Sequence, residues 1–183
     1  MKQTDLSTYN NSWYQPGSAI KKLLWYFVNV LFFMNPLNPS SSLKRILLKI
    51  FGAQVGDGVV IKPGVNIKYP WKLSIGNHTW IGEKVWIDNL DEVTIGNHCC
   101  LSQGAMLLCG NHNFKSKAFD LMIGSIVLED GTWIGARATL TPNTICKSHA
   151  VLTVQSVASG TLEAYTIYKG NPAKKIKVRV IED

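Results

Sequence analysis

One short phrase recurs along this chain of 183 residues at an interval of 20 residues. It reads Val55-Gly56-Asp57, then Ile75-Gly76-Asn77-His78, then Ile95-Gly96-Asn97-His98. Within each unit an apolar residue returns every six positions, and an extra pair, Leu73-Ser74 or Val93-Thr94, completes the 20 residues. The series runs Val55, Ile61, Ile67, Leu73; Ile75, Ile81, Ile87, Val93; Ile95, Leu101, Leu107, and the same phase resumes at Leu128, Ile134, Leu140, Cys146 and Leu152. A short period sustained through most of a chain indicates a solenoid, in which each repeat buries its face only against its neighbours.

The six-residue period predicts a short flat strand followed by a turn, with alternate side chains on opposite faces. The first position points inward, and the second is often Gly, which tolerates the backbone of a tight corner. The fifth position is also inward and is mostly small, as at Thr79, Cys99, Ala105 and Ala138. Three such edges close one coil of a triangular prism. We therefore expect an all-β solenoid, a parallel β-helix, over residues 53–170.

Residues 1–52 are expected to form a polar arm followed by an amphipathic helical cap. Residues 20–34 contain a 12-residue apolar stretch that is interrupted only by Asn29. It is too short to cross a bilayer, which needs about 20 apolar residues. A second helix after Ser40-Ser41-Ser42 places Leu43, Ile46, Leu47 and Ile50 on one face. Residues 20–51 either cover the open edge of the first coil or make peripheral contact with a membrane, and the sequence leaves both interpretations open.

Charge is unevenly distributed along the chain, although the net charge is +7. Residues 1–54 carry six Lys or Arg against one acid, residues 55–169 carry nine against nine, and the basic tail predicted at 171–183 follows. Basic ends suit phosphate groups, but no motif accompanies the charge, so we expect no nucleic-acid partner.

The four cysteines show neither metal-ligand spacing nor a disulfide framework. A polar N-terminus without a signal-peptide pattern predicts a cytoplasmic protein, peripheral to the inner membrane if the helices bind lipid.

Six-residue repeats of this kind resemble those of the hexapeptide-repeat acyltransferases, whose β-helix is left-handed. The likeness narrows to the WcaF-type acetyltransferases of colanic acid biosynthesis over roughly residues 20 to 178. The segments that carry it are Leu23-Leu24-Trp25-Tyr26, Asn35-Pro36-Leu37, Ile67-Lys68-Tyr69-Pro70-Trp71, Val85-Trp86-Ile87-Asp88-Asn89, Gly110-Asn111-His112 and Gly170-Asn171-Pro172-Ala173. The resemblance implies direct acetyl transfer from acetyl-CoA to a sugar hydroxyl, without a covalent acyl-enzyme.

The repeat breaks after Leu107, and residues 111–127 are expected to leave the prism as an active-site loop. His112 stands where this loop departs. The resemblance assigns it the role of general base, a role that suits a side chain whose ordinary pKa lies near neutral pH. Asn113 replaces the Asp that the family commonly has after this histidine.

The resemblance also places the two substrates. Asp88 and Asn89, one coil before the histidine, and Asn113 are the expected acceptor contacts. The expected acetyl-CoA contacts are Gly135, Ala136, Val154, Ser159, Lys174 and Lys177. Glycines that are usual in the family are missing around Leu152-Thr153-Val154-Gln155-Ser156, which indicates a narrower cofactor groove.

Three further expectations follow from the repeat and the resemblance. His78, His98 and His149 occupy outward corners without the ligand spacing of a zinc site, so we expect no metal. Trp80, Trp86 and Trp133 fall on outer faces, and the family is homotrimeric with active sites between subunits. The acceptor is expected to be an intermediate of bacterial exopolysaccharide, capsule or O-antigen. N-acetylation of an amino sugar, transfer of another acyl group, and a non-catalytic scaffold stay open as alternatives.

Overall fold

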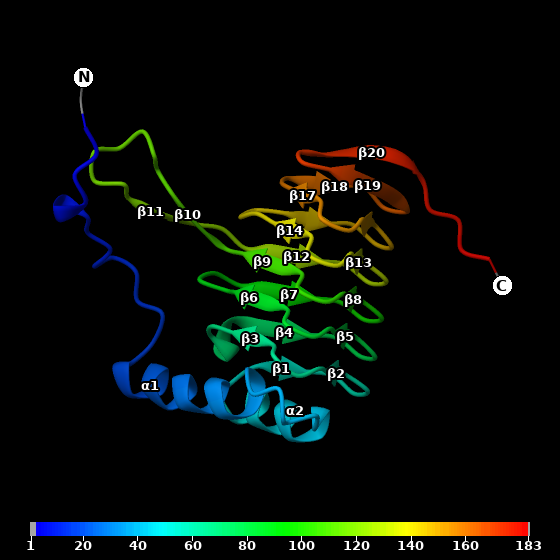
Figure 1. The fold of residues 1–183 in the computed structure, drawn as a ribbon, viewed down its shortest axis with the longest axis horizontal. Coiled ribbons are helices and arrows are strands. Elements are labelled where there is room, and N and C mark those ends of the chain that lie inside the picture. Colours follow the sequence, from blue (N-terminus) through cyan, green and yellow to red (C-terminus); the bar gives the residue numbers. More distant parts are fainter. Residues whose placement is uncertain (1–2, 183) are drawn as a thin grey trace.

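Residues 3–182 of the computed structural model form a prism of three parallel sheets, with two helical segments at one end (Figure 1). The first sheet contains β1 (Gln54–Val55), β4 (Leu73–Ile75), β7 (Val93–Ile95), β12 (Ile126–Leu128), β15 (Ile145–Cys146) and β18 (Thr161–Leu162). The second contains β2 (Val60–Ile61), β5 (Trp80–Ile81), β8 (Cys100–Leu101), β13 (Trp133–Ile134), β16 (Val151–Leu152), β19 (Thr166–Gly170) and β20 (Ala173–Val178). The third contains β3 (Asn66–Ile67), β6 (Trp86–Asp88), β9 (Met106–Leu108), β14 (Thr139–Leu140) and β17 (Val157–Ala158).

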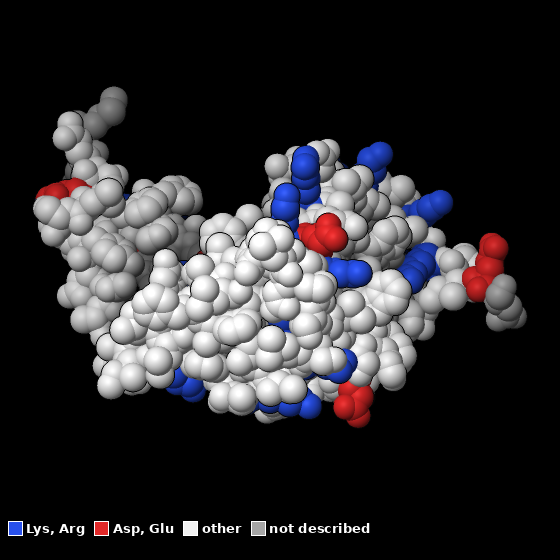
Figure 2. Space-filling view, turned by 60° about the horizontal axis from the view of Figure 1, so that its bottom comes forward, with Lys and Arg blue, Asp and Glu red and all other residues white. Residues whose placement is uncertain are grey.

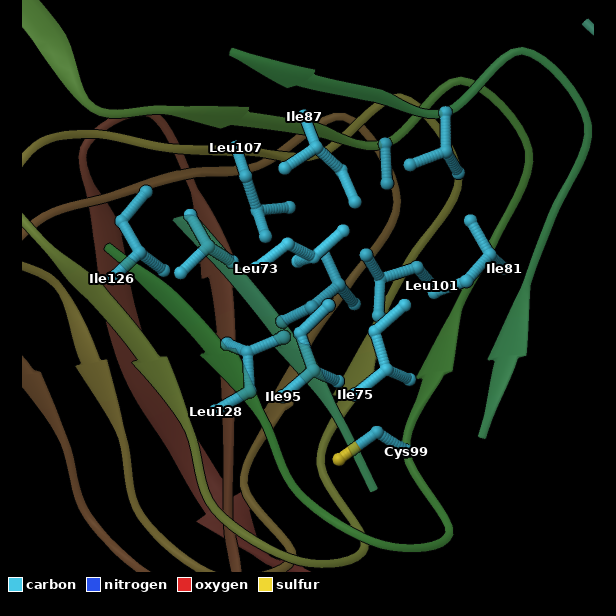
Figure 3. Packing of buried hydrophobic residues seen from close by; sticks show 14 of the residues in the cluster. Leu73, Ile75, Ile81, Ile87, Ile95, Cys99, Leu101, Leu107, Ile126 and Leu128 are labelled. Carbon is cyan, nitrogen blue, oxygen red and sulfur yellow. The ribbon is translucent and has the colours of Figure 1, made fainter. Parts of the chain in front are cut away.

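The sequence period becomes the strand register. Val55 pairs with Ile75, which pairs with Ile95, so residues separated by 20 positions lie one above another. Their side chains, with Leu128 and Cys146 above them, form one inward column, and the columns of the three sheets meet in a single core (Figure 3). The parallel β-helix predicted from the period is confirmed.

Two helices and a short π-helical turn cover the open first coil: α1 (Ala19–Val28), η2 (Asn29–Phe33) and α2 (Ser41–Ile50). Their anchors into the prism are Trp25, which donates to the Ile67 carbonyl at 2.7 Å, the buried Phe33, and Lys44. Two short 3₁₀ helices, η1 (Leu6–Thr8) and η3 (Pro70–Lys72), complete the described helical elements. No helix in residues 3–182 is long and apolar enough to cross a membrane.

The face that α2 turns toward the prism carries its cations Lys44 and Arg45 beside the fully buried Leu48. Lys44 is fully buried and Arg45 donates to the Val59 carbonyl, whereas Ile46 and Ile50 are exposed. The reason is that the first coil presents unpaired strand carbonyls, which need donors rather than methyl groups. The helix therefore covers the coil with two cations and Leu48, and it leaves Ile46 and Ile50 outside.

Two predicted boundaries are wrong. Ile126 and Val127 belong to β12 and pair with Val93 and Thr94, so the prism resumes before residue 128 and the extruded segment is shorter than 111–127. The expected tail at 171–183 contains β20, which folds back antiparallel on β19 and covers the last coil. Both segments pair because strand edges left open at these points require partners.

Candidate active site

The segment that interrupts the repeat is a β-hairpin projecting from the corner between the third and first sheets (Figure 1). Its strands are β10 (Gly110–His112) and β11 (Leu121–Ile123), and His112 lies opposite Leu121. The amide of Asn113 donates to the Asp120 carbonyl at 2.8 Å, which continues the ladder by one rung. His112 is therefore held by a regular antiparallel pair and not by an irregular loop.

The imidazole of His112 is fixed on both its edge and its face. Its Nδ1 lies 2.8 Å from the carbonyl oxygen of Phe119, and its ring stacks on the Phe119 ring at 4.4 Å with an interplanar angle of 9°. A carbonyl oxygen can only accept, so Nδ1 carries the hydrogen and Nε2 of the neutral ring keeps its lone pair. This is the tautomer that a proton acceptor at Nε2 requires.

His112 opens into a cleft of about 460 Å³ between the hairpin, the prism corner and the N-terminal arm. The lining residues are Tyr9, Asn11, Tyr14, Pro16, Lys22, Lys68, Tyr69, Leu90, His112 and Leu121. Two lysines and three tyrosines stand among them, and Lys68 is paired with the Asp88 carboxylate beside the cleft. The wall is therefore rich in aromatic rings, and Lys22 adds a positive charge to it. Such a wall suits a polar ligand with ring faces and anionic groups.

Sequence reasoning missed the N-terminal arm, residues 3–18, as a wall of this cleft. The Tyr9 ring lies 5.8 Å from the His112 ring, and Tyr14 Oη donates to the Leu90 carbonyl at 2.6 Å. Burial raises the pKa of Tyr14 above its usual value, so the phenol stays protonated. The arm is fixed at its start by Asp5, whose carboxylate lies 3.3 Å from Lys117 Nζ, and at its end by Trp71, whose indole donates to the Pro16 carbonyl. The density of aromatic residues in an otherwise polar stretch was the available signal.

The three expected acceptor residues lie in different surroundings. Asp88 has a mostly covered carboxylate that pairs with Lys68 Nζ at 2.8 Å, next to the cleft. Asn113 is exposed in the hairpin turn, where its side-chain oxygen accepts from the Lys115 amide at 3.1 Å. In this structure its amide group is committed to that turn, and Phe119 rather than Asn113 orients His112.

Asn89, expected as an acceptor contact, has its side chain inside the prism. It is fully buried, and its amide bonds the backbone N–H of Tyr69 at 2.9 Å and the Tyr69 carbonyl at 2.6 Å. A second donor contact reaches the Lys72 carbonyl at 3.3 Å. The residue fixes the corner between two coils, because a buried turn needs its polar backbone groups paired.

The expected cofactor residues occupy three places. Gly135, Ala136 and Val154 lie at the corner between the second and third sheets, where the Gln155 amide donates to the Ala136 carbonyl. Ser159 is at the next corner, between β17 and β18, and Lys174 and Lys177 are exposed on β20. A side chain at position 135 would have its Cβ 2.5 Å from the Val154 nitrogen, so the close approach of the two coils requires glycine.

The remaining histidines stack on neighbouring rings at the corner between the first and second sheets. His78 and His98 lie 5.2 Å apart, and His149 lies 4.7 Å from Tyr165. Within residues 3–182 no three His, Cys, Asp or Glu side chains come together as a metal site. These histidines are part of the outer corner and are remote in the fold from the hairpin.

The sequence and the fold of this chain are similar to those of known acetyltransferases. The chain is 34% identical over 167 residues to the protein assigned to colanic acid biosynthesis as the acetyltransferase WcaF in Escherichia coli K12, covering 91% of this chain and 92% of that one. A hexapeptide-repeat acetyltransferase of Vibrio cholerae, solved with acetyl-CoA, superposes with a TM-score of 0.81 at 18% identity, covering 91% and 93%. A galactoside acetyltransferase solved with coenzyme A gives 0.77 at 21% identity, covering 87% and 80%. No family model matches the chain.

The parallel β-helix of six-residue repeats has the fold of the hexapeptide-repeat acetyltransferases, and the superpositions confirm the fold class expected from the sequence. The resemblance stated from the sequence is also confirmed at the level of the family. The chain belongs to the colanic acid biosynthesis acetyltransferases.

Proposed function

We propose that this protein transfers the acetyl group of acetyl-CoA to a sugar hydroxyl in an intermediate of a bacterial surface polysaccharide. The observation that carries the proposal is the His112 imidazole, oriented by the Phe119 carbonyl with Nε2 free to take a proton. Family membership supports the acetyl donor and the polysaccharide setting, and the galactoside acetyltransferase among the structural neighbours supports a sugar acceptor.

In the proposed reaction the acceptor hydroxyl lies against His112 Nε2. The nitrogen removes the hydroxyl proton as the oxygen attacks the thioester carbonyl, and a C–O bond forms in a tetrahedral intermediate. The C–S bond then breaks, and the imidazolium returns the proton to the leaving thiolate. The products are the sugar O-acetyl ester and coenzyme A, and no acyl group is held by the protein.

The Phe119 carbonyl has a defined role in the proposed reaction. It accepts a hydrogen bond from Nδ1–H of His112 in every step, so it stabilises the imidazolium formed in the first step and keeps the ring from rotating. The stacked Phe119 ring excludes water from one face of the imidazole. General bases of this kind contribute about 10² to 10⁴ in rate.

For the acceptor, the positive charge of Lys22 in the cleft beside His112 supports a sugar that carries an anionic group. Lys22 and Lys68 are the two cations in its wall, and Tyr9 and Tyr69 offer ring faces to the C–H groups of a pyranose. Asp88 holds Lys68 in place and is proposed as a positioning residue for the acceptor site.

For the donor, we propose that the pantetheine arm follows the corner that contains Gly135, Ala136 and Val154. Ser159, Lys174 and Lys177 are proposed contacts toward the phosphates. We also propose a homotrimer that buries the outer faces of the second and third sheets. Three tryptophans on those faces, Trp80, Trp86 and Trp133, are 61%, 40% and 46% exposed in the single chain, which is an unusual surface for a monomer.

The test is thiol release from acetyl-CoA across a panel of sugar and sugar-phosphate acceptors, with His112→Ala compared with wild type. We expect acceptor-dependent release in the wild type and a loss of about 10² or more in kcat for the variant. His98→Ala is the matched control, since it removes an exposed histidine from a corner outside the cleft. Equal turnover in His112→Ala and wild type would refute the assignment of the base.

A further inference from the structure

The outward apolar side of the helical end is the largest feature of the molecule that the proposed reaction does not use. We propose that the outer surfaces of α1, η2 and α2 form a docking face that inserts shallowly into a bilayer containing anionic lipid. We name this the helical face. Its exposed apolar residues are Ile20, Leu23, Leu24, Tyr26, Phe27, Val30, Leu31, Met34, Leu37, Leu43, Ile46 and Ile50.

The exposure of this face follows from the way the helices cap the prism. Lys44 Nζ donates to the carbonyls of Asn38, Lys62 and Ile61 at 2.9, 3.2 and 3.3 Å. Ser41 Oγ accepts from the Ile61 amide at 3.0 Å. Because these polar groups of α2 are committed to the strand edge beside the buried Leu48, the side of the helix with Ile46 and Ile50 faces outward. A helix with the opposite orientation would be the ordinary arrangement on a water-exposed surface.

The helical face differs from scattered surface leucines because its large apolar side chains are both exposed and grouped together. Leu23, Phe27 and Leu31 are 58%, 54% and 57% exposed along one side of α1 and η2. Ile46 and Ile50 of α2 are 56% and 70% exposed. Figure 2 shows a broad field of uncharged side chains at the helical end, with lysines and arginines and some acidic side chains near its margin. An apolar field with a polar rim marks an interaction surface.

The charge of this segment favours a lipid surface as the occupant. Residues 19–52 contain Lys21, Lys22, Lys44, Arg45 and Lys49 and no Asp or Glu. Lys44 and Arg45 serve the cap, while the exposed Lys49 and the half-buried Lys21 and Lys22 remain near the rim. Basic residues around an amphipathic helix attract anionic headgroups, and the apolar side chains reach the acyl boundary.

A groove connects the helical face with the active site. It has a volume of about 430 Å³ and runs between α1 and β3, lined on its apolar side by Trp25, Tyr26, Val30 and Met34. It shares Lys22, Lys68 and Tyr69 with the cleft that contains His112. Docking by the helical face would thus place the cleft beside the membrane surface.

Liposome flotation tests the proposal without any substrate, so its outcome is separate from that of the acetyl-transfer assay. Wild type is mixed with vesicles of phosphatidylcholine containing 30% phosphatidylglycerol, on the order of an anionic inner leaflet. We expect it to float, to float less with pure phosphatidylcholine, and to be partly released by salt. The variant Leu31→Asp/Ile46→Asp should lose binding by about tenfold or more.

Ile176→Asp/Val178→Asp is the matched control, since these residues are 57% and 60% exposed on β20 at the far end of the prism (Figure 1). It adds the same charge and should float like wild type. Circular dichroism and thermal unfolding establish that each variant is folded. A wild type that stays at the bottom with anionic vesicles overturns the proposal. A smaller oligomer in Leu31→Asp/Ile46→Asp, measured by light scattering, also overturns it, because the face would then join two copies.

Discussion

Lys44 should account for much of the stability of the helical cap. Replacing it with Met keeps most of the side-chain volume and removes the ammonium that donates to three carbonyls. The Ile61 oxygen retains the Ser41 hydroxyl, so the carbonyls of Asn38 and Lys62 are the two that lose their donor. Each costs about 1–1.5 kcal/mol when left partly buried, which gives about 2–3 kcal/mol for the docking of α2.

Hydrogen exchange at the Ile61 amide measures this docking directly, since that amide donates to Ser41 Oγ only while α2 is in place. A loss of 2–3 kcal/mol corresponds to roughly 30- to 150-fold faster exchange. Lys49→Met is the control, because Lys49 lies on the same helix with its side chain in solvent, and it should change exchange by less than about fivefold. Equal exchange in Lys44→Met and Lys49→Met would refute the assigned role.

The pH dependence of stability gives a second check on Lys44. Burial lowers its pKa from the ordinary value of 10.5. Between the lowered pKa and 10.5 the unfolded chain binds more protons than the folded one, so this residue makes stability rise with pH in that window. Lys44→Met lacks the effect. The difference in the free energy of unfolding between wild type and Lys44→Met, measured by urea unfolding, should therefore increase from neutral pH toward pH 10.5. A difference that does not change with pH would contradict a lowered pKa of Lys44 in the folded protein.

Three further substitutions separate structure from chemistry. Asn89→Ala should lower the free energy of unfolding by about 2–4 kcal/mol, because it leaves buried backbone groups of Tyr69 unpaired. Thermal unfolding should show this loss of stability, while the kcat of the folded protein should stay equal to that of the wild type. Gly135→Ala should destabilise by about 1–3 kcal/mol, since the new Cβ would meet the Val154 backbone, and a melting temperature equal to wild type would contradict that contact. Tyr9→Ala should raise the KM for the acceptor about 2- to 10-fold while the KM for acetyl-CoA stays constant, and an equal rise in both would exclude the arm as part of the acceptor site.

The sequence predicted the parts of this molecule that repeat. Because Val55, Ile75 and Ile95 recur at one interval, the interval itself determines the register, and the inward columns follow without knowledge of distant contacts. The interruption after Leu107 likewise located the hairpin with His112, although not its strand pairing. Family resemblance supplied the role proposed for His112, since the position of one histidine carries no chemistry by itself.

The contacts that the sequence did not reveal are those with no period. Tyr14 reaches Leu90 across 76 residues and Trp71 reaches Pro16 across 55, and no local pattern encodes either pairing. The orientation of α2 was missed for a different reason. The amphipathic rule assumes that an apolar surface waits to be covered, whereas the edge of a first coil offers carbonyl oxygens, so Lys44 takes the place that a leucine would have in a bundle.

A solenoid cannot build a unique site from its repeats, because every coil presents the same corner as the one below it. In this chain the proposed cofactor corner lies in regular coils, but the candidate acceptor site gathers where the repeat fails: at the hairpin that carries His112, at the first coil where the helices cap the edge, and along the arm that joins the two. Lys22 and Lys68 illustrate the result, since one comes from the cap and the other from the first complete coil, yet both border the cleft and the groove. If the helical face binds lipid, the same end of the prism holds the acceptor cleft and the membrane contact. Sugar intermediates presented at a bilayer would then reach the base without leaving the surface.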